Sequence, residues 1–188
     1  MSTTNNTNQG SLPTGEGKGG ALICIIGPSG AGKDTAARIL SELTGIPVLV
    51  SFTTRPMRPD EKQGREHVFV HACHARKDDM LAYTEYGGYE YWTTLSQIHG
   101  KAIYVIDEEG IRDLKQNHPD IHITTIYITA SKIVRRQRGV TVERMQRDDL
   151  REQFPLDFYD YRIYNNKGKD DLMRKLIEIT DRITNDDL

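Results

Sequence analysis

The sequence predicts an α/β fold of three layers, with a central parallel sheet covered by helices on both faces. Apolar runs at residues 21–26, 48–50, 102–106 and 121–128 have the length of buried strands. Polar stretches of helical periodicity alternate with these runs, as in the βαβ units that build parallel sheets. The 188 residues suffice for one such domain and are too few for two of ordinary size.

The start of the chain divides into a polar tail and the first βα unit. Residues 1–20 are almost wholly small and polar, so we interpret them as a disordered tail before a domain over residues 21–188. After the first strand, apolar residues repeat at helical spacing over residues 34–43. Gly45 and Pro47 then end that helix.

The middle of the domain differs from its end. Between residues 51 and 94, prolines, charges, glycines and tyrosines replace the long apolar runs, and we expect a small lobe there that holds a second substrate. A last strand is predicted over residues 161–164. The closing helix after it carries on one face the apolar residues Leu172, Leu176, Ile179 and Ile183.

Composition limits the partners and the compartment. The chain is 37% hydrophobic and 28% charged, with a net charge of −2, which gives no electrostatic case for nucleic acid or an anionic membrane. No apolar run is long enough to span a bilayer, and the N-terminus lacks the pattern of a signal peptide. Cys24 and Cys73 lie in unlike settings, so we expect no disulfide and a cytoplasmic location. We also expect a monomer or homodimer.

A phosphate-binding loop follows the first strand directly. Its glycines let backbone N–H groups curl around phosphate oxygens, the next helix points its positive end at them, and Lys33 reaches the β- and γ-phosphates. Asp34 stands where the usual signature has a Ser or Thr ligand for Mg²⁺, and a carboxylate can bind this hard cation directly or through water. We therefore expect triphosphate binding by Gly27, Pro28, Ser29, Gly30, Ala31, Gly32, Lys33, Asp34 and Thr35.

A second phosphate site is predicted where residues 51–58 place two arginines among hydroxyl side chains. Arg55 and Arg58 are three residues apart and can converge on one dianionic phosphate, because each guanidinium offers a planar fork of donors. A solvated turn with scattered surface charge is the alternative for this stretch taken alone.

Together with the stretches at residues 64–70, 86–94 and 106–110, these motifs resemble the guanylate kinase family in order and spacing, over about residues 21–184. The resemblance implies a P-loop NTPase fold with a lobe for the nucleoside monophosphate at residues 51–94 and an arginine lid at residues 135–147. It also implies transfer of the γ-phosphoryl group of ATP to a nucleoside monophosphate, with Mg²⁺ as cofactor and GMP or dGMP as the first candidates.

The resemblance also assigns individual residues. Catalytic roles fall to the loop lysine, one acceptor arginine and three lid arginines, namely Lys33, Arg55, Arg136, Arg138 and Arg147. Asp107 orients Mg²⁺ or its water shell, and Asn165 lies near the adenine of ATP. The acceptor monophosphate is held by Ser51, Arg55, Arg58, His67 (where the family has a tyrosine) and Tyr91, with Thr93 at the base.

This chain departs from the family at the positions that read the base. Ala82 and Val105 stand where the family has a Glu and an Asp that accept hydrogen bonds from guanine. Each unpaired donor of a buried guanine would cost about 1–3 kcal/mol. Glu85 or Glu90 substitutes for these acids if the loop shifts register, and Trp92, in place of a glycine, reshapes the base pocket.

Four alternatives stay open. The ribose bisphosphokinases of phosphonate metabolism are a similar group with Gly-Lys-Asp in the loop and apolar residues at the acid positions, and a kinase for another nucleoside monophosphate is equally compatible. A non-catalytic binding module is disfavoured because Lys33 and both acceptor arginines are present. A zinc site has candidate ligands but no matching second half in the sequence; the candidates are His67, His71, Cys73 and His74.

Overall fold

The computed structural model describes residues 20–59, 61–65, 67–151 and 154–185. Except for Gly20, the tail predicted at residues 1–20 lies outside the described residues.

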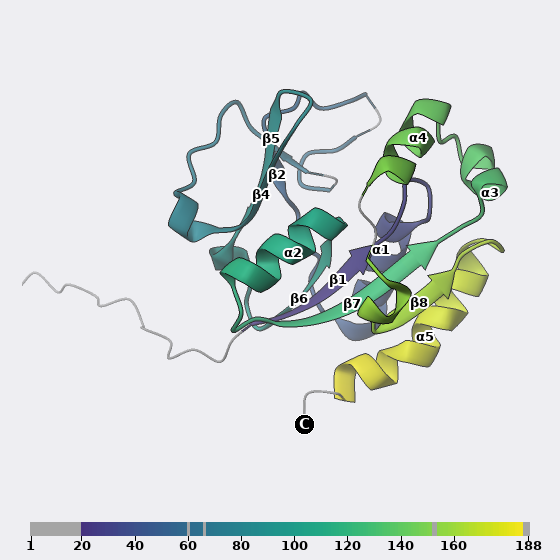
Figure 1. Ribbon diagram of the computed structural model, residues 1–188. Helices are drawn as coiled ribbons and strands as arrows, with labels where there is room; N and C mark the ends of the chain where they lie inside the picture. Colours follow the sequence, from purple (N-terminus) through teal and green to yellow (C-terminus); the bar gives the residue numbers. More distant parts are fainter. Residues whose placement is uncertain (1–19, 60, 66, 152–153, 186–188) are drawn as a thin grey trace, which may run out of the picture.

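The central sheet is parallel throughout and has the strand order β6-β1-β7-β8 (Figure 1). Its strands are β1 (Ala21–Ile26), β6 (Lys101–Val105), β7 (His122–Thr129) and β8 (Tyr161–Tyr164). β1 lies between two neighbours and is buried on both faces, which explains why it is one continuous apolar run rather than an alternating one. The predicted parallel sheet is confirmed.

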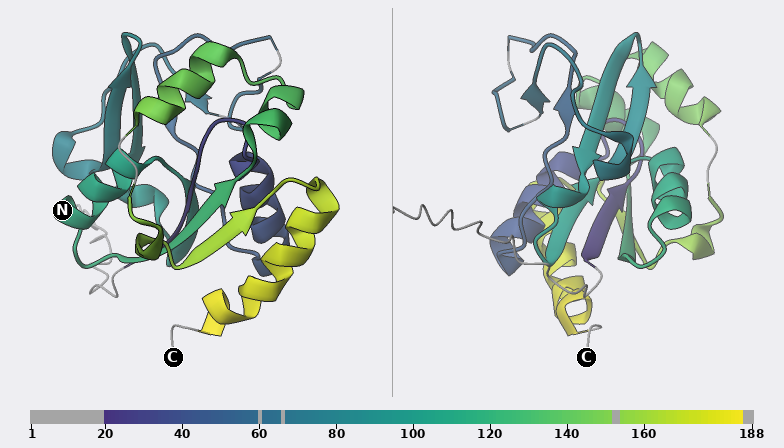
Figure 2. Two further views of the ribbon diagram at one scale, coloured as in Figure 1. Left: turned by 45° about the vertical axis from the view of Figure 1, so that its right-hand side comes forward. Right: turned by 90° about the vertical axis from the view of Figure 1, so that its left-hand side faces the viewer.

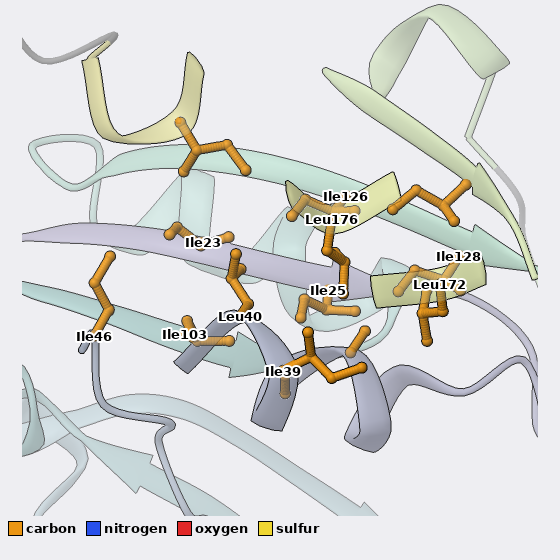
Figure 3. Close-up of a cluster of buried hydrophobic side chains, with 14 of the residues drawn as sticks. Ile23, Ile25, Ile39, Leu40, Ile46, Ile103, Ile126, Ile128, Leu172 and Leu176 are labelled. Atoms are coloured by element: carbon orange, nitrogen blue, oxygen red, sulfur yellow. The ribbon is translucent and has the colours of Figure 1, made fainter. Parts of the chain in front are cut away.

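Helices cover both faces of this sheet. Ile23 and Ile25 of β1 pack toward α1 (Lys33–Thr44) and α5 (Lys169–Asn185), as Figure 3 shows for the cluster that they join. The alternate β1 residues Leu22, Cys24 and Ile26 pack on the other face, against a layer that includes α2 (Glu108–Asn117). Figure 2 (right) shows the central strands between α1 and α2, so the predicted three layers are confirmed.

The strand predicted at residues 48–50 is wrong in extent. Only Val48 forms a bridge, to Ile103 of β6, and the next N–H, that of Leu49, donates to the Ile103 carbonyl at 2.7 Å. The Ser51 carbonyl already accepts from Val68 at 2.9 Å, in the second sheet. The chain therefore leaves the central sheet after a single bridge, because its next backbone hydrogen-bond partners belong to the second sheet.

A second sheet is formed by the chain between residues 52 and 94, in the order β3-β2-β5-β4. Its long hairpin turns at Gly87 and Gly88, whose φ angles of 61° and 77° suit the tight turns that match strand twist. Its strands are β2 (Phe52–Thr53), β3 (Val68–Phe69), β4 (Met80–Tyr86) and β5 (Tyr89–Thr94), flanked by the 3₁₀ turns η1 (Lys77–Asp79) and η2 (Leu95–Gln97).

Two short helices, α3 (Lys132–Gln137) and α4 (Val142–Leu150), follow β7, and the turn η3 (Leu156–Phe158) leads into β8. In Figures 1 and 2, α3 and α4 and the second sheet stand at the end of the central sheet to which the strands point. That end is where open parallel sheets bind ligands. Within the described part of the chain, no helix has the length and apolar character needed to cross a membrane.

The packing of α5 on the central sheet makes a stability prediction. Leu176 is fully buried and Ile177, the next residue, is 49% exposed. Leu176→Ala should lower the free energy of unfolding by about 2–5 kcal/mol, because it leaves a cavity between α5 and α1. Ile177→Ala is the matched control and should cost less than about 1 kcal/mol. Urea denaturation measures both, and equal losses would contradict the packing described here.

Candidate active site

The phosphate loop is a turn that only glycine permits at several positions. Gly27, Gly30 and Gly32 have φ angles of 144°, 74° and 101°. A Cβ atom at Gly27 would lie 1.9 Å from the Ile128 carbonyl oxygen, and one at Gly32 would lie 2.5 Å from Asn165 Nδ2. The loop is therefore held in contact with the ends of β7 and β8.

The loop leads into the N-terminus of α1. No side chain caps this end, and the first intrahelical bond is donated by Ala36 to the Gly32 carbonyl at 2.9 Å. The N–H groups of the first turn thus have no partner inside the helix and can bind an anion. Lys33 Nζ donates to the Gly27 and Pro28 carbonyls, at 2.8 and 3.2 Å. Burial lowers the pKa of Lys33, and the Asp34 carboxylate opposes that shift.

A cavity of about 560 Å³ opens in front of this loop. It brings together seven residues that the sequence analysis singled out for the site: Ser29, Lys33, Ser51, His67, Tyr91, Asp107 and Arg147. Its other walls come from β4 and β5, the end of β6, the start of α2, and α4. The phosphate loop, the second sheet and the lid helix α4 therefore share one space.

Three predicted acceptor residues form a polar cluster on one wall of the cavity. Ser51 Oγ lies 2.8 Å from His67 Nδ1, and the His67 ring meets the Tyr91 ring edge-on at 5.6 Å. Ser51 lies directly before β2, His67 lies directly before β3, and Tyr91 lies in β5. The structure thus assembles a group of hydrogen-bonding side chains of the type that holds a phosphate.

The two acceptor arginines are not among the residues that line the cavity. The Arg55 guanidinium donates to both carboxylate oxygens of Glu61, at 3.0 and 2.8 Å, and Arg58 lies 3.8 Å from the same carboxylate. The bonds from Arg55 lower the pKa of Glu61 to about 2, and the Arg58 backbone N–H adds to the effect. Arg55 is nevertheless close to the cavity wall, since the Tyr91 hydroxyl helps to raise its pKa, after the larger contribution of Glu61.

Tyr104 lines the end of the cavity at which the sequence analysis placed the base, and the sequence analysis did not consider this residue. Tyr104 lines the cavity, is 7% exposed, and accepts a hydrogen bond from Thr93 Oγ1 at 3.1 Å. Burial raises the pKa of Tyr104 to about 12, so it stays a neutral phenol. Thr93, predicted to contact the base, is fully buried and is not among the lining residues. The Thr93 hydroxyl is bonded to the Tyr104 phenol, and the contact of Thr93 with the base stays a prediction.

Apolar and acidic side chains complete the base end. Ala82 and Val105 line the cavity where the family has its acids, and Ala82 pairs in register with Thr93. Glu85 lines the cavity, whereas the opposite residue, Glu90, accepts a bond from the Tyr83 hydroxyl at 3.1 Å. Trp92 is buried and stacks on Phe52, with ring centroids 5.6 Å apart.

Two carboxylates on α2 also line the cavity, namely Glu109 and Asp113. They are four residues apart, which places them on the same side of the helix. The sequence analysis assigned no role to either residue. The spacing was visible in the sequence, but the side of α2 that faces the second sheet was not.

The lid arginines divide into two groups. Arg147, Arg144 and Arg151 line the cavity; Arg151 was missed because it follows the end of α4. Arg136, predicted to be catalytic, is exposed on α3 and is not among the lining residues, and neither is Arg138.

Arg135 of α3 and Arg138, directly after α3, bind the loop itself. Arg138 donates to the carbonyls of Gly30, Ala31 and Asn165, at 2.9, 3.3 and 2.8 Å. Arg135 Nε donates to the Ser29 carbonyl at 2.7 Å. Asn165, predicted near adenine, is 4% exposed, and its amide donates to the Ala31 carbonyl at 2.8 Å. These side chains brace the phosphate loop from behind.

The predicted metal ligands are Asp107 and Asp34. Asp107 lines the cavity and caps α2, with Oδ1 accepting from the Gly110 N–H at 2.9 Å, while Asp34 is exposed on the first turn of α1. Among the residues that the structure describes, no three His, Cys, Asp or Glu side chains gather as a metal site. This sparse donor set fits a magnesium ion that is held mainly by phosphate oxygens and water.

Comparison with known proteins gives consistent matches. A family model described as guanylate kinase matches residues 19–181. The guanylate kinase of Fusobacterium nucleatum is 30% identical over 166 residues, which cover 79% of this chain and 89% of the relative. That of Gloeobacter violaceus is 30% identical over 164 residues, covering 78% of this chain and 80% of the relative.

The fold has a match among solved structures. A crystal structure of guanylate kinase from Anaplasma phagocytophilum superposes with a TM-score of 0.62 at 21% identity, covering 90% of this chain and 87% of that one. The superposition supports the three-layer fold, and the sequence matches span both sheets.

The ion pair of Glu61 makes a pH prediction. Its folded pKa of about 2 lies below the ordinary value of 4.5, so the unfolded chain takes up the proton first as the pH falls. The stabilisation is therefore complete above about pH 5 and is lost as the pH approaches about 2. Urea denaturation across this range should show wild type more stable than Glu61→Gln near neutral pH, with the difference shrinking in acid.

Glu42→Gln, which removes an exposed carboxylate from α1, is the control for loss of one charge. A difference between wild type and Glu61→Gln that is the same at every pH would contradict the ion pair.

Proposed function

The chain belongs to the guanylate kinase family, and we propose on that premise that it transfers the γ-phosphoryl group of ATP to a nucleoside monophosphate, with GMP and dGMP as first candidates. The observation that carries the proposal is the single cavity shared by Lys33, the Ser51–His67–Tyr91 cluster and Arg147. A donor and an acceptor phosphate held at these places would meet in one space. Such proximity is the main requirement of phosphoryl transfer.

The donor half rests on the phosphate loop. The uncapped N–H groups of α1 and the Lys33 ammonium would hold the β- and γ-phosphates. Asp107, with Asp34, would hold Mg²⁺ directly or through water, and the ion would neutralise charge on the phosphate oxygens. In this role Lys33 exchanges the carbonyls of Gly27 and Pro28 for phosphate oxygens.

The acceptor half rests on hydroxyls and guanidinium groups. Ser51, His67 and Tyr91 would bind the acceptor phosphate. Arg55 would join them by exchanging part of its bonding to Glu61, since it already lies beside Tyr91. A protonated His67 would add positive charge to the same cluster.

The lid arginines supply positive charge where negative charge develops during the reaction. Arg144, Arg147 and Arg151 line the cavity beside Lys33, and their guanidinium groups would stabilise the transferring phosphoryl group. Closing this space also excludes water that would otherwise hydrolyse ATP. No side-chain nucleophile is required, because positioning and electrostatics suffice.

A second candidate acceptor is favoured by the base end of the cavity. The side chains of Ala82 and Val105 cannot accept hydrogen bonds, and the Thr93 hydroxyl donates its hydrogen bond to Tyr104. The two apolar residues, Ala82 and Val105, support an acceptor other than a guanine nucleotide, either a nucleoside monophosphate with another base or a sugar bisphosphate such as ribose 1,5-bisphosphate. Glu85, Glu109 and Asp113 would then accept bonds from its amine or hydroxyl groups.

An ADP-release assay with MgATP and a panel of acceptors tests this function. The panel contains GMP, dGMP, AMP, CMP, UMP, dTMP and ribose 1,5-bisphosphate. We expect turnover with at least one member; GMP or dGMP alone would show that the acids of β4 and α2 replace the missing ones. Another preferred acceptor would show that Ala82 and Val105 report a changed specificity. Failure to bind MgATP would contradict the proposal and favour a binding module.

Two substitutions separate the donor and acceptor halves. Lys33→Ala should lower kcat about a hundredfold, with little change in the acceptor KM, because Lys33 serves the donor phosphates. Arg55→Ala should raise the acceptor KM about tenfold or more. Arg76→Ala, which removes an exposed arginine from the same lobe, is the control. Steady-state kinetics with the best acceptor of the panel checks this, and full activity in either variant would contradict the assignment.

A further inference from the structure

A buried ion pair joins the two lid helices directly behind the phosphate loop. Arg135 of α3 and Asp148 of α4 are 4% and 5% exposed, and Arg135 Nη2 lies 2.5 Å from Asp148 Oδ2. When two charged side chains are buried as a pair, the N–H groups and oxygen atoms that do not bond the partner need other hydrogen bonds. In this pair, those bonds go to a single residue of the loop.

That residue is Ser29, and it is held at three atoms. Its N–H donates to Asp148 Oδ2 at 2.8 Å, its hydroxyl donates to Asp148 Oδ1 at 3.1 Å, and its carbonyl accepts from Arg135 Nε at 2.7 Å. Both peptide groups of Ser29 are therefore fixed, since a rotation of either would break a charge-assisted bond. Ser29 itself lines the cavity beside Lys33.

The same pair fixes the lid relative to the cavity. Arg147, the residue before Asp148, donates from Nη2 to Ser29 Oγ at 3.3 Å and lines the cavity. Val140, in the turn between α3 and α4, packs on Gly30 so closely that a Cβ atom there would lie 2.3 Å from Val140 Cγ2. The loop and the lid thus contact each other at Ser29 and Gly30.

We propose that Arg135 and Asp148 are positioning residues for the donor phosphates: through Ser29 they hold the phosphate loop in its phosphate-binding conformation, and they place Arg147 over the reacting group. The proposal rests on the proposed kinase function. In this proposal Arg135 of α3 holds the loop in shape, whereas Arg144 and Arg147 of α4 contact the substrate.

Asp148→Asn tests the proposal, and the neighbouring substitution Asp149→Asn is the matched control. Asp149 lies next in the same helix, but its carboxylate binds Lys132 on the surface at 2.7 Å and does not line the cavity. Calorimetric titration gives the dissociation constants of MgATP and of the best acceptor of the panel, and steady-state assays with the same acceptor give kcat. Circular dichroism confirms that each variant is folded at the assay temperature.

The expected result is a selective loss at the donor site. Asp148→Asn should weaken MgATP binding and lower kcat, each by about tenfold, while the affinity for the acceptor changes by less than about twofold. Arg135→Lys keeps the charge but loses the planar fork, so it should show a similar loss. Asp149→Asn should match wild type in every measurement.

Two results would overturn the proposal. A folded Asp148→Asn protein with lower thermal stability but wild-type MgATP affinity and kcat would show that the pair is only structural. If that variant does not fold, Arg135→Lys serves instead, because it loses the fork that bonds both the Ser29 carbonyl and Asp148, and wild-type MgATP affinity and kcat in folded Arg135→Lys would overturn the proposal equally. A wild-type protein that does not bind MgATP would refute the kinase function itself, which is a distinguishable outcome.

Discussion

A phosphate loop has to turn N–H groups toward its ligand, and this leaves carbonyl groups on its outer side that need partners. In this chain the outer carbonyls of Ser29, Gly30 and Ala31 accept bonds from Arg135, Arg138 and Asn165. Glycines make the turn possible, since Gly27 and Gly32 approach other parts of the protein too closely for any side chain. The placement of the lid follows from the same constraint, because the groups that satisfy the loop come from α3, α4 and the end of β8.

The cavity in front of the loop has two ends of different character. The donor end keeps the features of a phosphate site, with Lys33, Asp107 and the arginines of α4. At the proposed acceptor end, the Ser51–His67–Tyr91 cluster offers hydrogen-bonding groups of the kind that bind phosphate, whereas Ala82 and Val105, the residues predicted to stand in place of the acids that read guanine, offer no side-chain acceptor. Reaction class and acceptor specificity therefore depend on separate parts of the molecule, and one can change while the other is retained.

Much of the fold could be predicted because its signals are local. β1 and β8 have the predicted bounds, since an apolar run buried on both faces and a strand before an amphipathic helix are visible in a short window. The strand at residues 48–50 was wrong because three apolar residues do not reveal where the next backbone partners lie. In the site, Lys33 and Ser51 were found from motifs. Asp148 could not be, because its partner Ser29 lies 119 positions away and a lone aspartate on a polar helix gives no signal. Tyr104 was missed for the same reason, since its role depends on Thr93 across the space between two sheets.

The central claim is that lid side chains hold the phosphate loop in the form that binds the triphosphate. A crystal structure with Mg²⁺ and a non-hydrolysable ATP analogue tests it most directly. The account predicts the β- and γ-phosphates on the N–H groups at the start of α1, with the bonds of Ser29 to Arg135 and Asp148 intact and Arg147 directed at the γ-phosphate. A triphosphate bound in the loop while Asp148 has left Ser29 and the lid helices have moved away would contradict it.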